Sequence, residues 1–157
     1  MRLVLQRVSS ANVTVEGEEP RAIGPGLVAL VGICPGDDAK TADWMAKKTL
    51  GLRVFTDGAG KLNLSVLETG GELLVVSNFT LYADCKKGRR PAFTGAAGPE
   101  LAQPLYERFA AALREGGGRV TTGTFGGAME VDIHNSGPIT ILLDSEEIMP
   151  KKERSQQ

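Results

Sequence analysis

The chain has 157 residues, a length typical of one globular domain with a sizeable core. Its 18 basic and 19 acidic side chains nearly balance, so the net charge neither requires nor excludes a nucleic acid partner. No apolar run reaches the length of a membrane span, about 18 residues, and Arg2 and Arg7 interrupt any signal-like start. We therefore expect a soluble, cytoplasmic protein. Cys34 and Cys85 have neither metal-site spacing nor the number typical of a disulfide framework, which predicts reduced thiols.

The first part of the chain predicts strands with one helix between them. Apolar residues alternate over residues 1–15, and Ser9–Ser10 fit a bend or bulge that divides this stretch into two strand segments. Asp37–Asp38 begin a helix with one apolar stripe, which ends at Gly51. The other short strands predicted here are 21–23, 27–33, 52–55 and 63–66.

An apolar run ends abruptly on polar side chains in the middle of the chain. Leu73–Val76 follow two glycines, and they are too few and too branched for a helix, which predicts a strand buried on both faces. The four residues after this strand are Ser77, Asn78, Phe79 and Thr80. Their polar groups either bond neighbouring backbone at the strand end or form a site wall, in which the ring faces a flat ligand.

The second part of the chain begins with a basic loop, residues 86–90, whose cations are Lys86, Lys87, Arg89 and Arg90. This loop is either a solvated surface loop or a phosphate-binding one. A second helix follows residues 98–100, and Pro104 indicates that it either kinks or starts near Gln103. Three glycines at 116–118 end it.

The remaining residues predict three strands and a tail. The strands are 120–125, 129–133 and 139–143, and residues 134–138 separate the last two. The predicted fold is α+β, with a largely antiparallel sheet curled into a barrel and two helices packed outside it. Residues 1–144 form one domain, and the charged tail 145–157 is expected to fray.

The usual catalytic machinery is mostly absent from the sequence. His134 is the only histidine, and it is interpreted as a structural residue at a strand end. No GxSxG elbow, phosphate-binding glycine loop or metal motif occurs, so no metal or other cofactor is expected. An enzyme of this composition would work by positioning and by borrowed functional groups. Gly137–Pro138 is either a plain turn or a dipeptide that presents two carbonyl oxygens in an unusual orientation.

Two distant motifs resemble those of one family. Ser77–Leu81, SNFTL, is similar to the SQFTL signature of the D-aminoacyl-tRNA deacylases, and Asn135–Thr140, NSGPIT, is similar to their NxGPVT signature. The stretches Leu5–Val15 and Gly51–Leu64 are also similar to that family. The resemblance therefore covers residues 1 to about 144.

The resemblance implies a homodimeric enzyme that hydrolyses the ester between a D-amino acid and the 3′-terminal adenosine of tRNA. It implies a cis Gly137–Pro138 bond whose carbonyl oxygens enter the partner's pocket and exclude an L side chain, with Arg7 helping to fix the motif. It also implies that Phe79 contacts the terminal adenine, beside Ser77 and Asn78 as further substrate-binding residues. Glycine has no side chain to exclude, so such a pocket should also admit glycyl-tRNA.

The mechanism and two alternative functions follow from the same residues. Thr80 is a candidate nucleophile without an evident base, and we favour the family account, in which the 2′-hydroxyl of the terminal ribose assists hydrolysis. Main-chain amides near Phe79 and Thr80 would then stabilise the oxyanion. Asn78 replaces the signature glutamine and is one methylene shorter, so the interaction of its amide would either disappear or be bridged by water. The alternatives are a non-catalytic RNA-end binding module and a relaxed deacylase that acts mainly on mischarged glycyl-tRNA.

Overall fold

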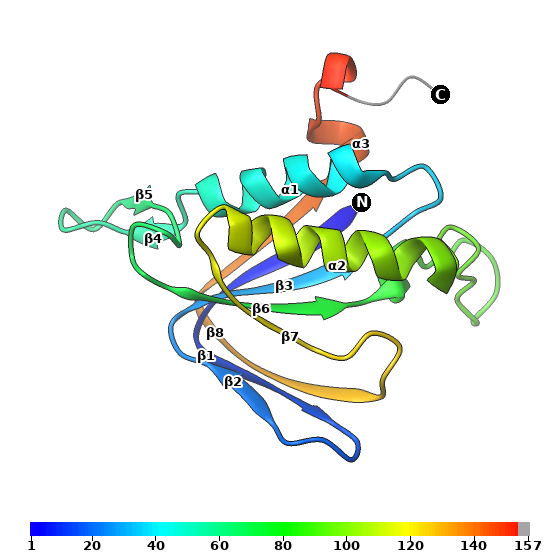
Figure 1. Cartoon of the computed structure of the whole chain (residues 1–157), viewed down its shortest axis with the longest axis horizontal. Helices are drawn as coiled ribbons and strands as arrows, with labels where there is room; N and C mark the ends of the chain where they lie inside the picture. The colour runs from blue at the N-terminus through cyan, green and yellow to red at the C-terminus, as the bar shows by residue number, and fades with distance from the viewer. Residues whose placement is uncertain (154–157) are drawn as a thin grey trace.

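The structure is a computed structural model that describes residues 1–153 of the chain. Its main sheet consists of β1 (Arg2–Val15), β2 (Arg21–Ile23), β3 (Gly26–Gly32), β6 (Glu72–Ser77), β7 (Arg119–Thr122) and β8 (Met129–Asp144). The other elements are the hairpin of β4 (Phe55–Thr56) and β5 (Leu62–Leu64), the helices α1 (Ala39–Gly51), α2 (Pro99–Glu115) and α3 (Ser145–Ile148), and the 3₁₀ turns η1 (Phe79–Tyr82) and η2 (Lys151–Glu153). The sheet curls strongly, and α1 and α2 lie side by side against one of its faces (Figure 1). The predicted α+β class with a barrel-like sheet is confirmed.

The strand order is β2-β1-β3-β6-β7, with β8 on the other edge of β1. β1 pairs antiparallel with β2, β3 and β8, in line with the largely antiparallel sheet that was predicted, whereas β3, β6 and β7 run parallel to one another. The reason is that α1 lies between β3 and β6 in the chain and α2 between β6 and β7. Parallel neighbours need such crossover connections, which bring the chain back to the same end of the sheet.

β6 is the centre of the core, as its sequence predicts. Leu73 and Val75 pack with the residues that face the helices, among them Met45 of α1 and Phe109 of α2. Leu74 and Val76 belong to a second cluster on the opposite face of the sheet. Because both faces are covered, every residue in this run is apolar.

β1 and β8 are each longer than predicted. Residues 1–15 form one continuous strand, with irregular pairing between Gln6 and Ser10, so the prediction of two separate segments is wrong. Likewise, 129–133 and 139–143 belong to the single strand β8. Gln6 pairs with Thr140 and Val8 pairs with Asn135, which leaves residues 136–139 as a bulge opposite Arg7. A bulge bends a strand without ending it.

The helices begin at the residues that their capping groups predict. The Asp38 side chain accepts a hydrogen bond of 2.8 Å from the Thr41 amide at the start of α1. α2 begins at Pro99 and runs through Pro104, so a start near Gln103 is wrong. Pro104 has no backbone N–H, so the carbonyl oxygen one turn earlier in the helix lacks its usual donor. Because Pro104 is exposed, this carbonyl oxygen can bond water. None of the helices within residues 1–153 is long and apolar enough to cross a membrane.

The predicted frayed tail is wrong for its first residues. The Asp144 side chain accepts a hydrogen bond of 3.0 Å from the Glu146 amide and caps α3, a helix that the sequence reading missed. Met149 is only 3% exposed, and the Ser145 hydroxyl accepts a hydrogen bond of 2.7 Å from the amino group of Met1. Residues 154–157 of the predicted tail lie outside the described residues.

Candidate active site

A cavity of about 550 Å³ opens beyond the carboxyl ends of the parallel strands β3 and β6. This is the edge at which sheets with helical crossovers commonly bind ligands. Its lining residues are Val31, Ile33, Ser77, Asn78, Phe79, Phe93, Ala96, Ala97, Gly98, Pro99, Ala102, Phe125, Gly126, Gly127 and Met129. The cavity therefore lies between the end of β6, the start of α2 and the loop before β8.

The described residues that line the cavity include no acid or base. Within the described part of the chain, the residues around the cavity are apolar or small, and their only polar side chains are those of Ser77 and Asn78. General acid–base catalysis requires a titratable group within hydrogen-bond reach of the reacting atoms. None of the described lining residues of this chain can act as such a group.

Two phenylalanine rings form the aromatic part of the lining. Phe79, the first residue of η1, contacts Phe93 edge to face, with 5.1 Å between ring centroids and an angle of 78° between the ring planes. Phe79 is 58% exposed and Phe93 38% exposed, which is unusual for rings of this size. Exposed rings beside a cavity are suited to stacking on a flat ligand. The sequence reading missed Phe93, whose only signal was an aromatic residue in a glycine-containing loop.

The polar residues after β6 are fixed by local hydrogen bonds. The backbone amide of Asn78 donates to the Val31 carbonyl oxygen over 2.8 Å and so continues the pairing of β6 with β3. The Thr80 hydroxyl donates to the side-chain oxygen of Asn78. Ser77 and Asn78 line the cavity, whereas Thr80 is not among the described lining residues.

The backbone of η1 begins with two amides, and the first of them belongs to a residue that lines the cavity. The first hydrogen bond of this turn runs over 3.3 Å from the Leu81 amide to the Asn78 carbonyl oxygen. The amides of Phe79 and Thr80 precede it, and the first amides of a helical turn have no acceptor within the turn. They are the donors that the sequence reading assigned to an oxyanion.

The opposite wall of the cavity is held by a network that the sequence reading missed. The guanidinium of Arg21 donates to the Thr122 carbonyl oxygen over 2.7 Å and forms an ion pair with Glu18. The Thr124 hydroxyl lies 3.0 Å from a carboxylate oxygen of Glu18. These contacts join the β1–β2 turn to the loop that carries Phe125 and two lining glycines.

Phe125 is supported from behind by a buried tyrosine. Its ring contacts Tyr106 of α2, with 5.8 Å between centroids, and the Tyr106 hydroxyl donates to the Val75 carbonyl oxygen over 2.8 Å. Burial raises the pKa of Tyr106 to about 12, which keeps this donor protonated. The cavity wall thus rests on the central strand of the core.

Gly137 and Pro138 lie in the bulge of β8 and are not among the described residues that line the cavity of the same chain. Their peptide bond is cis, as the sequence resemblance implied. Arg7, which faces the bulge, donates from Nε to the Ser136 carbonyl oxygen over 3.2 Å and from Nη1 to the Val54 carbonyl oxygen over 3.0 Å. A Cβ at position 137 would lie 3.1 Å from Nη2 of Arg7, and the φ of +121° also favours glycine there.

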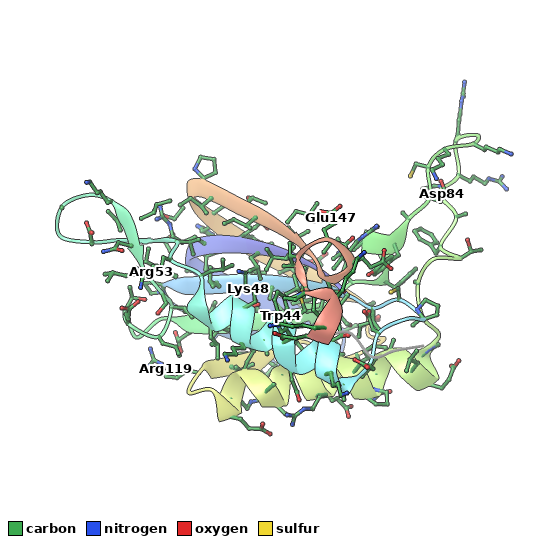
Figure 2. The ribbon with its side chains drawn as sticks, turned by 90° about the horizontal axis from the view of Figure 1, so that it is seen from above. Trp44, Lys48, Arg53, Asp84, Arg119 and Glu147 are labelled. Carbon is green, nitrogen blue, oxygen red and sulfur yellow. The ribbon has the colours of Figure 1, made fainter. Side chains whose placement is uncertain are left out.

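The basic loop stands away from the body of the molecule. Figure 2 shows it projecting beside Asp84, at the opposite end from Arg53 and the β4–β5 hairpin. A bridge between Asp84 and Ala92 closes the loop next to Phe93. All four cations are exposed, and none forms an ion pair with another residue of the described range. The loop therefore offers free positive charge near the aromatic part of the cavity.

Other candidate residues lie away from the cavity. His134 is exposed on β8, where it pairs with Ser10. Cys34 is buried and Cys85 exposed, and both are free thiols. Across residues 1–153, no group of three or more His, Cys, Asp or Glu side chains could hold a metal ion.

Comparison with known proteins places this fold and cavity in a family of hydrolases. The model of the family described as D-Tyr-tRNA(Tyr) deacylase matches residues 4–144. The chain is 55% identical over 148 residues to a D-aminoacyl-tRNA deacylase of Thermomicrobium roseum, covering 94% of this chain and 96% of that protein. It is 53% identical over 153 residues to the protein of the same name from Chloroflexus aurantiacus, covering 97% and 96%.

Two solved structures share the fold. A c-Myc DNA unwinding element binding protein superposes with a TM-score of 0.85 at 43% identity, over 92% of this chain and 99% of that chain. A probable eukaryotic D-amino acid tRNA deacylase superposes with a TM-score of 0.78 at 19% identity, over 90% and 97%, and supports the fold alone. The chain belongs to the D-aminoacyl-tRNA deacylase family. It is a deacylase, and the resemblance drawn from its two motifs is confirmed.

Proposed function

We propose that this deacylase hydrolyses the ester between a D-amino acid, or glycine, and the 3′-terminal adenosine of tRNA, and rejects the L-esters. The observation that carries the proposal is the cavity itself, which combines exposed aromatic rings, two polar side chains and free backbone amides without any acid or base. Its volume of about 550 Å³ lies in the usual range for small-molecule sites, about 300–1,000 Å³. A cavity of this kind suits a nucleoside that carries a small acyl group.

The aromatic pair supports recognition of the tRNA end. The adenine would stack on Phe79 and contact the edge of the Phe93 ring. The basic loop, which is anchored next to Phe93, would then contact the phosphates that precede the terminal nucleoside. Asn78 and Ser77 would hydrogen-bond the ribose or the aminoacyl group.

The composition of the lining supports substrate-assisted hydrolysis. The 2′-hydroxyl of the ribose would orient and activate a water molecule, whose oxygen adds to the ester carbonyl carbon. The amides of Phe79 and Thr80 would stabilise the negative charge on the carbonyl oxygen. The bond from the carbonyl carbon to the 3′-oxygen then breaks, the 3′-oxygen takes the proton that the water gave up, passed on through the 2′-hydroxyl, and free amino acid and tRNA are released.

The position of the bulge supports a homodimer in which each subunit completes the other's site. Gly137 and Pro138 are exposed and lie outside their own chain's cavity, so their carbonyl oxygens can act as a chiral selector only in a partner. Leu142, on the same strand, is 68% exposed. Val4 pairs with both Leu142 and Leu30, so these three side chains form an apolar strip on the face of the sheet opposite the helices. Such a strip is typical of an interface.

The decisive experiment measures release of amino acid from D-tyrosyl-tRNA, L-tyrosyl-tRNA and glycyl-tRNA. We expect rapid release from the D-ester and from glycyl-tRNA, and release from the L-ester at the rate in buffer. D-tyrosine release no faster than in buffer would remove the proposal. Faster release of glycine than of any D-residue would favour the relaxed deacylase.

A second candidate function is a nucleic-acid binding module without turnover. The observation in its favour is the 43% identical relative whose name describes binding to a DNA unwinding element. The same assay separates the two functions, because a binding module would retain D-tyrosyl-tRNA on a filter without releasing tyrosine. The cytoplasmic location stays a prediction from the sequence.

A further inference from the structure

We infer that Asn135 is a positioning residue of the proposed chiral selector, which it holds in place by closing the bulge that carries Gly137 and Pro138. The inference rests on the proposed function and adds a residue to it. The observation is the bulge in β8, where residues 136–139 leave the ladder opposite Arg7.

The side chain of Asn135 bonds both backbone groups of Ile139. Its Oδ1 accepts from the Ile139 amide over 3.0 Å, and its Nδ2 donates to the Ile139 carbonyl oxygen over 3.2 Å. An asparagine amide can replace a peptide group in this way. The two hydrogen bonds close residues 136–138 into a loop. In this loop the β8 backbone lacks its usual partners on β1, because only Arg7 lies opposite the bulge.

Two further contacts fix the ends of this loop. Nδ2 of Asn135 also lies 3.1 Å from Oγ1 of Thr140, which accepts from Nε2 of Gln6 over 3.3 Å. At the other end, Nε of Arg7 donates to the Ser136 carbonyl oxygen. The loop is thus held at its start by Arg7 and at its close by Asn135.

Within one subunit, hydrogen bonds hold the loop in position because burial does not. Gly137 and Pro138 are both exposed in the subunit, and glycine has no side chain to pack. A selector that works by steric exclusion depends on where its carbonyl oxygens lie, and a shift of about 1 Å in a positioned group can change a rate about 100-fold. Loosening the loop should therefore admit L side chains before it lowers release of D-residues.

The test compares D-tyrosyl-tRNA and L-tyrosyl-tRNA with the full-length dimer and four variants. Asn135→Ala removes all three hydrogen bonds, and Asn135→Asp keeps the acceptor for the Ile139 amide but loses both donors. Thr140→Val removes the second anchor. Asn12→Ala is the matched control, because Asn12 lies on the same strand pair, opposite Asp132, and its side chain makes no hydrogen bond with another described residue.

We expect Asn135→Ala to lower the ratio of D to L release about tenfold or more, mainly by faster release of L-tyrosine. Asn135→Asp and Thr140→Val should show smaller losses, and Asn12→Ala none. An Asn135→Ala dimer with the wild-type melting temperature and the wild-type ratio would overturn the inference. If Asn135→Ala does not fold, an unchanged ratio in both Asn135→Asp and Thr140→Val would overturn it equally. If the wild-type protein itself does not discriminate, the proposed function fails first.

Discussion

The hydroxyl of Thr80 donates its hydrogen bond to the side-chain oxygen of Asn78. An amide oxygen is not a base that could remove the hydroxyl proton, so this contact orients Asn78 and does not activate Thr80. Because the side-chain oxygen of Asn78 accepts this hydrogen bond, the NH₂ group of the same side chain remains available to the substrate. Asparagine in place of the signature glutamine thus retains a donor beside the cavity.

The first prediction concerns Thr80. Thr80→Val should lower kcat/KM about tenfold, because one neutral hydrogen bond is removed. Thr80→Ser, which keeps the hydroxyl, should retain wild-type activity and serves as the matched control. Loss of a true nucleophile costs far more, about 10⁶-fold in one well-studied hydrolase. A Thr80→Val variant with no detectable turnover would therefore restore Thr80 as the nucleophile.

Phe79 is predicted to act in binding and not in stability. Phe79→Ala should raise KM about tenfold or more, since stacking of a base on an aromatic ring contributes about 1–3 kcal/mol. The melting temperature should stay unchanged, because the ring is 58% exposed. Leu62→Ala is a suitable control, as Leu62 is similarly exposed on the distant β4–β5 hairpin. A wild-type KM for Phe79→Ala would place the adenine elsewhere.

The basic loop is predicted to contact phosphates. Replacing its four cations by glutamine should weaken tRNA binding and reduce the slope of log K against log salt by about 0.7–0.9 for each phosphate that the loop no longer neutralises. Replacing the exposed lysines of α1, Lys40 and Lys47, by glutamine is the control, and it should leave the slope unchanged. Fluorescence anisotropy over a range of salt concentrations measures both slopes. Equal slopes for the wild type and the loop variant would show that the loop is only solvated.

The apolar strip is predicted to be the dimer interface. Leu142→Asp should give a monomer in sedimentation velocity, because a carboxylate would be buried between the subunits. It should also release L-tyrosine as well as D-tyrosine, since the selector of each site belongs to the partner. Leu67→Asp changes another exposed leucine, after β5, and should leave the dimer and its activity intact. A Leu142→Asp monomer that still rejects L-tyrosyl-tRNA would contradict the shared site.

Tyr106 is predicted to make stability fall at high pH. Burial raises its pKa to about 12, above the value of about 10 expected in the unfolded chain. The unfolded state therefore loses the proton first, so the contribution to stability is complete below pH 10 and declines towards pH 12. Tyr106→Phe should lower the free energy of unfolding by about 0.5–1.5 kcal/mol at pH 8, because the Val75 carbonyl oxygen loses one of its two donors and keeps the Gly123 amide.

Urea unfolding at pH 8 and pH 11 measures both effects of the Tyr106 substitution. The Phe variant should lose less stability than the wild type between these values. It should still lose some, because burial also raises the pKa of Tyr82. Equal losses for the two proteins would show that Tyr106 is not the group that titrates.

Local patterns were sufficient to predict the core and the polar half of the cavity. An uninterrupted apolar run such as Leu73–Val76 is compatible only with a strand covered on both faces, and the structure shows this strand between two clusters. Asp38 predicts the start of α1 because its side chain caps the helix through a residue only three positions away. Ser77 and Asn78 could be assigned to a site because they follow that buried strand directly.

The rest depends on contacts between residues far apart in the sequence. Phe93 reaches the cavity through its contact with Phe79. The opposite wall is held by the ion pair of Glu18 with Arg21 and by the contact of Glu18 with Thr124. The sequence Gly137–Pro138 predicts a break between two strands. In the structure β8 continues past this dipeptide, because one asparagine side chain bonds the backbone on its far side. No periodicity reports such tertiary contacts.

Among residues 1–153, no ionisable side chain lines the cavity, which has a consequence for inhibitors. A compound confined to this lining, out of reach of the basic loop, would find no charged side chain with which to form an ion pair, and its affinity would have to come from ring contact and fit to the peptide groups. Such a compound should bind equally well in mildly acidic and mildly alkaline buffer, in contrast to inhibitors of hydrolases that rely on a histidine or a carboxylate.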